Sequence, residues 1–139
     1  MKTKNIKSGF TLLEISIVAA ILGVLTVMAI PRLGRTIERM RANEGEQILY
    51  NLLSAQQRYS IDHMQGDFVP VYADSIAKLD IEINLTPTNF QAPTVSATPP
   101  VASITRNDGT YTLRITPPGT ITCDCSGFPC ATCTQLGYN

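Results

Sequence analysis

Hydrophobic residues are distributed unevenly along this 139-residue chain, and the longest apolar run lies near its N-terminus. Residues 15–30 are almost wholly apolar, and Glu14 is the single charged residue between Phe10 and Pro31. About 21 helical residues at a rise of ~1.5 Å each span 30 Å, which is the thickness of the hydrocarbon core of a bilayer. The pattern therefore predicts that residues 10–31 form a membrane-spanning helix.

The helical period continues beyond this run, but over residues 32–65 the pattern becomes amphipathic. One half of the helix is thus expected to be apolar all round, and the other half to pack under a globular part. Gly66 predicts the end of the helix. The packed face is expected to carry Ile37, Met40, Ile48, Leu52, Ala55 and Tyr59, and the opposite face Glu38, Arg39, Arg41, Glu46 and Gln57.

Several residues that disfavour helices interrupt this long element. Pro31 lacks a backbone N–H and its ring clashes with the preceding turn, and Gly34 follows closely. We therefore predict a kink or a melted stretch around residues 27–34, with a gentle bend as the alternative. Gly23 is a further candidate for a kink, and Gly45 predicts a weaker break.

Residues 66–139 read as a globular part with an antiparallel sheet of three or four strands. Asn107-Asp108-Gly109 is a hairpin signal, and Pro118-Gly119 suits the centre of a second turn. The fold class expected is α+β, with the long N-terminal helix packed on the small sheet. The predicted strands are 80–85, 101–106, 110–116 and 120–124, with one helical turn at 74–79 capped by Asp74 and a Pro-rich surface loop at 86–100.

Four cysteines, Cys123, Cys125, Cys130 and Cys133, fall close together near the C-terminus. Such a cluster forms disulfides in an oxidising compartment, or a metal site in a reducing one. A redox C-x-x-C pair is a third interpretation. Two disulfides are the prediction that best suits an exported segment. A bond between Cys123 and Cys125 would close a strained ring, so two pairings between the 123/125 and 130/133 pairs stay open.

The charges at the N-terminus indicate the compartment in which the cysteines are expected to lie. Lys2, Lys4 and Lys7 precede the apolar run, which favours a cytoplasmic N-terminus and an exported remainder. An ordinary secretory signal does not fit, because no small-x-small cleavage site follows the run. A plain membrane anchor does not explain Glu14, since a carboxylate in an apolar helix costs about 2.5–3.5 kcal/mol on insertion scales.

These residues carry a family resemblance. The stretch Lys7-Ser8-Gly9-Phe10-Thr11-Leu12-Leu13-Glu14 resembles the processing site of type IV pilins and of type II secretion pseudopilins. The resemblance implies a leader at residues 1–9, which a prepilin peptidase removes after Gly9. It implies N-methylation of the new N-terminus at Phe10, and a role for Glu14 in an assembly salt bridge with that amine.

The resemblance also implies partners and places. The chain would sit in the inner membrane with its head in the periplasm, engage the assembly platform, and polymerise with copies of itself and other pilins. It would end in an extracellular filament or a periplasmic pseudopilus. The function expected is that of a structural subunit of a type IV pilus, major or minor, with a pseudopilin as the alternative. Many pilins close their C-terminal region with a disulfide.

Other classes of function have little support. The formal net charge is zero, so no nucleic-acid partner is predicted. No nucleophile–base pair or phosphate-binding loop stands out, and the lone His63 at a helix end is expected to be structural. We therefore expect no enzyme, no catalytic residue, no cofactor and no bound metal. A membrane-anchored redox or metal-binding protein is a remote alternative that depends on the cysteines alone.

Overall fold

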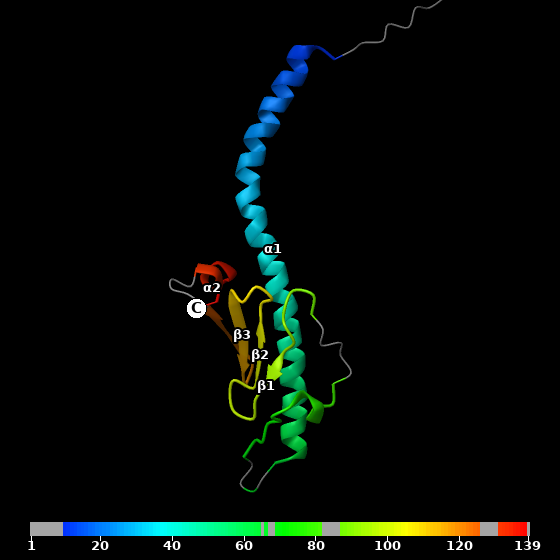
Figure 1. Ribbon diagram of the computed structural model, residues 1–139, viewed down its shortest axis with the longest axis vertical. Helices are drawn as coiled ribbons and strands as arrows, with labels where there is room; N and C mark the ends of the chain where they lie inside the picture. Colours follow the sequence, from blue (N-terminus) through cyan, green and yellow to red (C-terminus); the bar gives the residue numbers. More distant parts are fainter. Residues whose placement is uncertain (1–9, 65, 67–68, 82–86, 126–130, 139) are drawn as a thin grey trace, which may run out of the picture. The chain divides into compact units, whose positions relative to one another are not determined.

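The computed structural model describes residues 10–64, 66, 69–81, 87–125 and 131–138. Its elements confirm the α+β class, with one long N-terminal helix and a four-stranded antiparallel sheet (Figure 1). In chain order they are α1 (Leu12–Asp62), the 3-10 turn η2 (Ile76–Lys78), β1 (Thr94–Val95), β2 (Ala102–Thr105), β3 (Tyr111–Thr116), β4 (Thr120–Cys125) and α2 (Ala131–Leu136).

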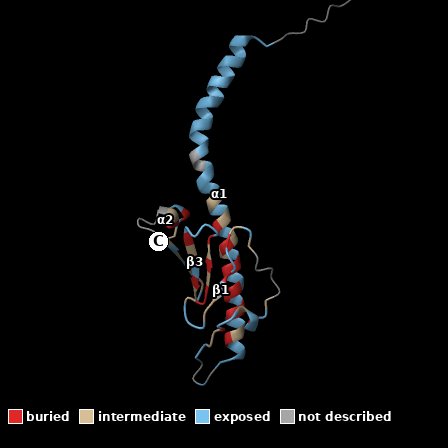
Figure 2. Ribbon diagram, viewed as in Figure 1, coloured by how far each residue is buried: buried red, intermediate tan, exposed pale blue. Residues whose placement is uncertain are grey.

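The chain divides into two compact units, Met1–Thr36 and Ile37–Asn139. Helix α1 contributes to both of them. In the first unit, all described side chains from residue 10 onwards are exposed, so this part of α1 has no core of its own (Figure 2). Residues 27–34 are helical throughout, so the melted stretch expected there is not found. The kink at Gly23, Pro31 or Gly34 stays a prediction.

The second unit, which we call the head, has its core between α1 and one face of the sheet. The strands follow the order β1-β2-β3-β4, and each neighbouring pair is antiparallel. Strand β3 alternates strictly, with Tyr111, Leu113 and Ile115 buried at 1% exposure or less. Leu49 and Leu52 of α1 are also fully buried and belong to the same core cluster. The buried face of the strands, which repeats every two residues, thus packs against the buried face of the helix, which repeats every 3.6 residues.

The face of α1 that packs in the head differs from the predicted one. Ile37 and Met40 are 47% and 67% exposed, whereas Glu38 lies at the packed side in an ion pair with Arg106. Ile48, Leu52 and Ala55 are buried as predicted, and Tyr59 packs against the core. The buried face also includes Ala42, Leu49, Leu53 and Gln56. The prediction was wrong for the first turns of this segment because the sheet, which the helical period alone does not place, determines which side is covered.

The strands at 101–106, 110–116 and 120–124 are confirmed with small shifts in their ends. The hairpin signal is confirmed as well, since Gly109 N–H donates to the carbonyl of Arg106 at 2.8 Å and Gly109 adopts φ +72°. The other turn spans Thr116 to Gly119, so its centre lies one residue earlier than predicted, at the cis-linked Pro117-Pro118.

Three local predictions need correction or lie outside the description. The cap of η2 is Ser75 rather than Asp74, because the Ser75 hydroxyl accepts from Ala77 N–H at 3.3 Å. Most of the strand predicted at 80–85 lies outside the described residues, and residues 80–81 are not in a strand. The segment predicted as a Pro-rich loop contains the short strand β1, and the helix α2 in the cysteine-rich segment was not predicted.

Gly45 has a packing role instead of forming a break in the helix. It lies in a continuous part of α1, and a Cβ atom there would stand 2.9 Å from Cζ of Phe90 and 3.2 Å from Cδ1 of Leu113. Phe90 has little room to move, since it is 2% exposed and packs edge-on against Tyr111. The close approach of helix and sheet at this point therefore requires the absence of a side chain.

We expect Gly45→Ala to lower the free energy of unfolding of the head by about 1–2 kcal/mol. Overpacking a dense core costs more than the ~1 kcal/mol that alanine adds to helix propensity. Thermal melting of the detergent-solubilised chain measures the change. Gly34→Ala is the matched control, because nothing lies within 4 Å of its Cβ position. Equal melting temperatures for the two variants would contradict this role of Gly45.

Candidate functional site

The N-terminal turn of α1 holds the residues of the predicted processing and assembly site. Gly9 lies outside the described residues, and Phe10 is 80% exposed directly before the helix. Thr11 caps the helix, since its side-chain oxygen accepts from the backbone N–H of Glu14 at 3.2 Å. Thr11 and Glu14 have the spacing of a capping box, T-x-x-E, so this role of Thr11 was visible in the sequence and was missed.

The carboxylate of Glu14 is distinctive among the polar groups of this segment. The hydroxyls of Ser16 and Thr26 donate to the helix carbonyls of Leu13 and Leu22, at 2.8 and 2.6 Å. They are therefore satisfied within the helix itself. Within the described residues the Glu14 carboxylate has no hydrogen bond or ion pair. A partner from outside this set of contacts would be needed once the segment lies in an apolar medium.

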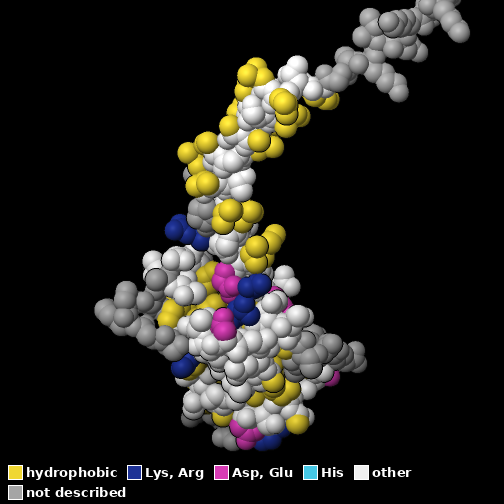
Figure 3. All heavy atoms as spheres, turned by 45° about the horizontal axis from the view of Figure 1, so that its top comes forward, with side chains coloured by type: hydrophobic (Ala, Val, Ile, Leu, Met, Phe, Trp, Pro, Cys, Tyr) yellow, Lys and Arg dark blue, Asp and Glu magenta, His cyan; other side chains and the backbone are white. Residues whose placement is uncertain are grey.

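The apolar part of α1 is suited to a membrane. By length and composition α1 is the one helix, among the residues described, that can cross a bilayer, with a mean hydropathy of 2.4 over its best 18-residue window. None of that window is buried within the chain. Hydrophobic side chains cover this part of the helix in the space-filling view (Figure 3). The segment thus presents apolar surface on all sides to whatever surrounds it.

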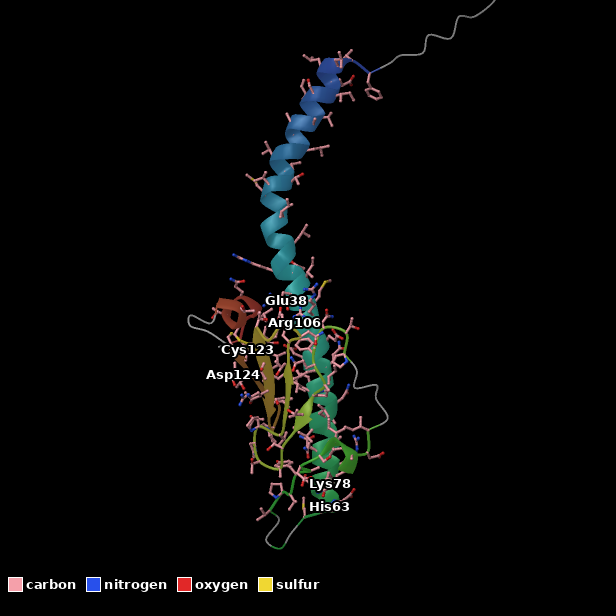
Figure 4. All side chains as sticks on the ribbon, in the orientation of Figure 1. Glu38, His63, Lys78, Arg106, Cys123 and Asp124 are labelled. Atoms are coloured by element: carbon pink, nitrogen blue, oxygen red, sulfur yellow. A yellow bond between two sulfur atoms is a disulfide. The ribbon has the colours of Figure 1, made fainter. Side chains whose placement is uncertain are left out.

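A polar cluster joins α1 to the sheet within the head. Glu38 accepts from Nε of Arg106 at 2.8 Å and from the hydroxyl of Tyr111 at 3.1 Å (Figure 4). Arg41 completes the cluster with a 3.0 Å ion pair to Glu38. Arg106 is 8% exposed and also donates to the carbonyl of Asn89 at 2.6 Å. The charges of the buried Arg106 and the half-buried Glu38 therefore neutralise each other, which limits the cost of removing them from water.

The cluster shifts the pKa of its acid. Burial raises the pKa of the Glu38 carboxyl, but hydrogen bonds from Arg106, Arg41 and Tyr111 outweigh burial and hold that pKa below its usual value of 4.5. The same ion pair raises the pKa of Arg106, and burial raises the pKa of Tyr111. The folded head thus favours the ionised form of Glu38.

A second polar anchor lies deeper in the head. Gln56 is fully buried, and its amide donates to the carbonyls of Ala73 and Val101 at 2.9 and 3.3 Å. Its side-chain oxygen accepts from Ala73 N–H at 2.7 Å. One helix residue thereby satisfies backbone groups of two loop segments. Sequence analysis missed this residue because a glutamine in an amphipathic helix carries no signal of burial.

The cysteines meet at the junction of β4 and α2. Cys123 and Cys125 lie on the inner face of β4, opposite Leu113 and Tyr111 of β3. Cys123 forms a disulfide with Cys133 of α2, with 5.7 Å between their Cα atoms. Cys125 is disulfide-bonded as well, and Cys130 lies outside the described residues. The Cys123–Cys133 bond is one of the pairings that the sequence left open.

His63 lies at the end of α1, where it was predicted to be structural. Its ring stacks on Tyr59 with 4.0 Å between centroids, and its Nδ1 lies 3.0 Å from the carbonyl of Tyr59. No nucleophile is among the residues in these contacts. The geometry agrees with a stabilising role at the end of the helix.

Taken together, these features define a class of protein: a single apolar helix that begins with an acidic capping turn and continues into a disulfide-closed α+β head. Residues 4–30 match the family model described as the prokaryotic N-terminal methylation motif. This motif is the prepilin-type signature of type IV pilins and pseudopilins, and the N-terminal segment of the chain carries it. Neither the curated proteins nor the solved structures contain a significant match to it.

The Glu38 cluster predicts how the stability of the head depends on pH. Because the pKa of Glu38 is lower in the folded state than in the unfolded state, the ion pair stabilises the head above pH 4.5. This contribution is lost as pH falls from 4.5 through the lowered folded pKa. We expect Glu38→Gln to cost about 1–2 kcal/mol at neutral pH, a value reduced for partial exposure.

Denaturant unfolding of the head between pH 7 and pH 3 measures this effect. The wild-type curve should fall more steeply below pH 4.5 than the curve of Glu38→Gln. Parallel curves for the two proteins would show that Glu38 is not responsible. Thr112→Ala, on the outer face of the same sheet, provides a control for general effects of substitution.

The disulfides predict a defined peptide map. Peptide mapping of the unreduced chain should recover Cys123 linked to Cys133, and Cys125 linked to Cys130, the remaining cysteine of the sequence. Reduction should add the mass of four hydrogens, two for each of two bonds. Free thiols in protein isolated without reductant, or a linkage of Cys123 to Cys125, would contradict the assignment.

Proposed function

We propose that this chain is a structural subunit, major or minor, of a type IV pilus or a pilus-like filament. In this proposal a prepilin peptidase removes residues 1–9, methylates the amine of Phe10, and leaves the apolar helix on the mature subunit. The observation that carries the proposal is the N-terminal turn, where Glu14 lies within the methylation motif and has no partner in the described contacts.

The chemistry of cleavage explains why Glu14 is useful. Cutting after Gly9 creates a positive amine at Phe10, directly before the N-terminus of α1, where the helix dipole already concentrates positive charge. The carboxylate of Glu14 compensates that charge, from the same chain or from a neighbouring one. In an apolar environment an uncompensated charge costs several kcal/mol, so pairing between chains favours docking and sets their axial register.

The apolar surface of α1 supplies the driving force for assembly. Its large side chains from Leu12 to Leu33 are about half exposed or more, so the helix needs lipid before assembly and other helices afterwards. We infer that residues 10–31 form the filament core and residues 32–65 join this core to the globular part of residues 66–139. Gly23, Pro31 and Gly34 are the positions at which the helix would bend.

The partners follow from the same proposal. Before assembly the N-terminus would face the cytoplasm and the head the periplasm, with the assembly platform of the inner membrane as a partner. The subunit would then polymerise with copies of itself and other pilins. Its role would be structural rather than enzymatic, which agrees with the pilin-type motif.

A pseudopilin of a type II secretion system is the second candidate, because the same motif marks both kinds of subunit. The Cys123–Cys133 bridge favours the pilus, since many pilins close their C-terminal region with a disulfide. The two candidates differ in where the fibre ends, which electron microscopy of fibres sheared from the cell surface can decide.

The test of assembly replaces Glu14 with valine. We expect Glu14→Val to be processed normally, with Phe10 as a methylated N-terminus by mass analysis, but to lower the amount of assembled filament at least about tenfold. A lost pairing of more than ~1.4 kcal/mol is sufficient for this change. Fibres are quantified by shearing, microscopy and immunoblotting.

Ser16→Ala is the matched control, because the Ser16 hydroxyl bonds only to the carbonyl of Leu13 in the same turn. This variant should assemble like the wild type. Normal fibre number and length in Glu14→Val would refute the assembly role. Processed wild-type subunits that form no surface fibres would favour the pseudopilin.

A further inference from the structure

The junction of β4 and α2 gathers three sulfur atoms in a small space. The sulfurs of Cys123, Cys125 and Cys133 all lie within 4.8 Å of one another. Cys123 and Cys125 are two residues apart on one face of β4, and Cys133 approaches from α2 with only 4% of its surface exposed. The Cys123–Cys133 bond joins two of these sulfurs, and the sulfur of Cys125 lies 2.8 Å from that of Cys133. Pairing of β4 with β3 fixes the backbone of the two strand cysteines.

Sulfur atoms are the only potential metal ligands that converge at this cluster among the described residues. Asp124 lies between the two strand cysteines in sequence but on the outer face of β4, where its carboxylate pairs with Arg114 at 2.8 Å. Leu113 and Tyr111 stand opposite the cysteines in the register of β3. In this part of the described chain, the ligand atoms that converge are therefore soft sulfurs rather than carboxylate oxygens.

We propose that the reduced form of this chain binds a thiophilic d10 cation, of the class of Zn²⁺, through Cys123, Cys125 and Cys133. Thiolates are the preferred ligands of such cations, and the ligand sulfurs of one ion stand a few ångströms apart, because each lies about 2.3 Å from the metal. The disulfide and the metal use the same atoms, so they are alternative ways to close one junction. This inference does not depend on filament assembly.

The chemistry of the exchange balances. An added phosphine gives two electrons to each disulfide and becomes its oxide, while one water molecule supplies the oxygen and the two protons of the two thiols formed. Three thiols then bind one Zn²⁺ and release three protons, leaving a complex with a net charge of −1. An added small-molecule disulfide accepts two electrons for each protein disulfide that re-forms and, with two protons from solvent, becomes two thiols, and the ion is released.

Closure of this junction holds the C-terminal segment on the head. Leu136 is buried, its carbonyl accepts from a guanidinium nitrogen of Arg39 at 3.3 Å, and the hydroxyl of Tyr138 donates to Glu46. These contacts depend on α2 staying beside β4. A metal that bridges Cys133 to the strand cysteines would keep them in place when the disulfide is absent.

The test uses the full chain in detergent, reduced with a phosphine under argon and titrated with Cd²⁺ or Zn²⁺ alone. We expect one ion per chain, a thiolate-to-cadmium absorption band, protection of Cys123, Cys125 and Cys133 from alkylation, and recovery by Zn²⁺ of melting temperature lost on reduction. Cys125→Ser should weaken binding by at least about 10–100-fold, because even the supporting partners of metal ligands contribute that much.

Asp124→Asn is the matched control, since it changes the neighbouring residue on the other face of β4 and should bind the ions like the wild type. Circular dichroism of oxidised Cys125→Ser, which retains the Cys123–Cys133 pair, checks its fold. The proposal is overturned if the reduced wild type binds no ion, or if Cys125→Ser binds as tightly as the wild type. Binding lost equally in Asp124→Asn would also overturn the ligand set.

Discussion

The apolar surface of α1 in the first unit imposes the central constraint on this molecule. Side chains such as Leu13, Ile21 and Leu25 are between 55% and 71% exposed, and no other element among the described residues of their unit covers them. Each buried methylene is worth about 0.8 kcal/mol, so this surface strongly favours lipid or other helices over water. The acidic capping turn at its start and the folded head in the second unit are therefore attached to a segment that cannot remain alone in water.

The head meets a different requirement, because its part of the same helix must be covered on one side only. Polar contacts help to determine which side of the helix is covered. Glu38 pairs with Arg106 near the start of the head, and Gln56 satisfies backbone groups of two loops further along. An error in helix rotation or register would leave these buried groups without partners, which costs more than the contacts themselves contribute. Gly45 permits the close approach of α1 to Phe90 and to Leu113 of the sheet.

Structural features set by residues close together in the sequence were predicted better than features set by contacts between distant residues. The apolar run, the processing motif and the Asn107–Gly109 hairpin are local patterns, and the helix, the family motif and the turn are found where expected. The predicted packing face of α1 was wrong in the first turns of the head, because that face depends on a sheet formed by residues far along the chain. Strand β1 and helix α2 are too short to have a clear period, and burial of Gln56 has no local signal. The role of Thr11 was readable and was overlooked.

The proposed membrane topology connects the charges at the N-terminus with the redox state of the cysteines near the C-terminus. Under the proposed topology, the lysines before Gly9 keep the N-terminus in the cytoplasm, so the head reaches an oxidising space. That placement determines whether Cys123 and Cys133 are thiols or a disulfide. Under the same proposal, the charge pattern of residues 1–9 determines the redox environment of cysteines more than a hundred residues away. The same topology gives α2 covalent attachment only after export, so the contacts of Leu136 and Tyr138 are secured in the compartment in which the head has to remain folded.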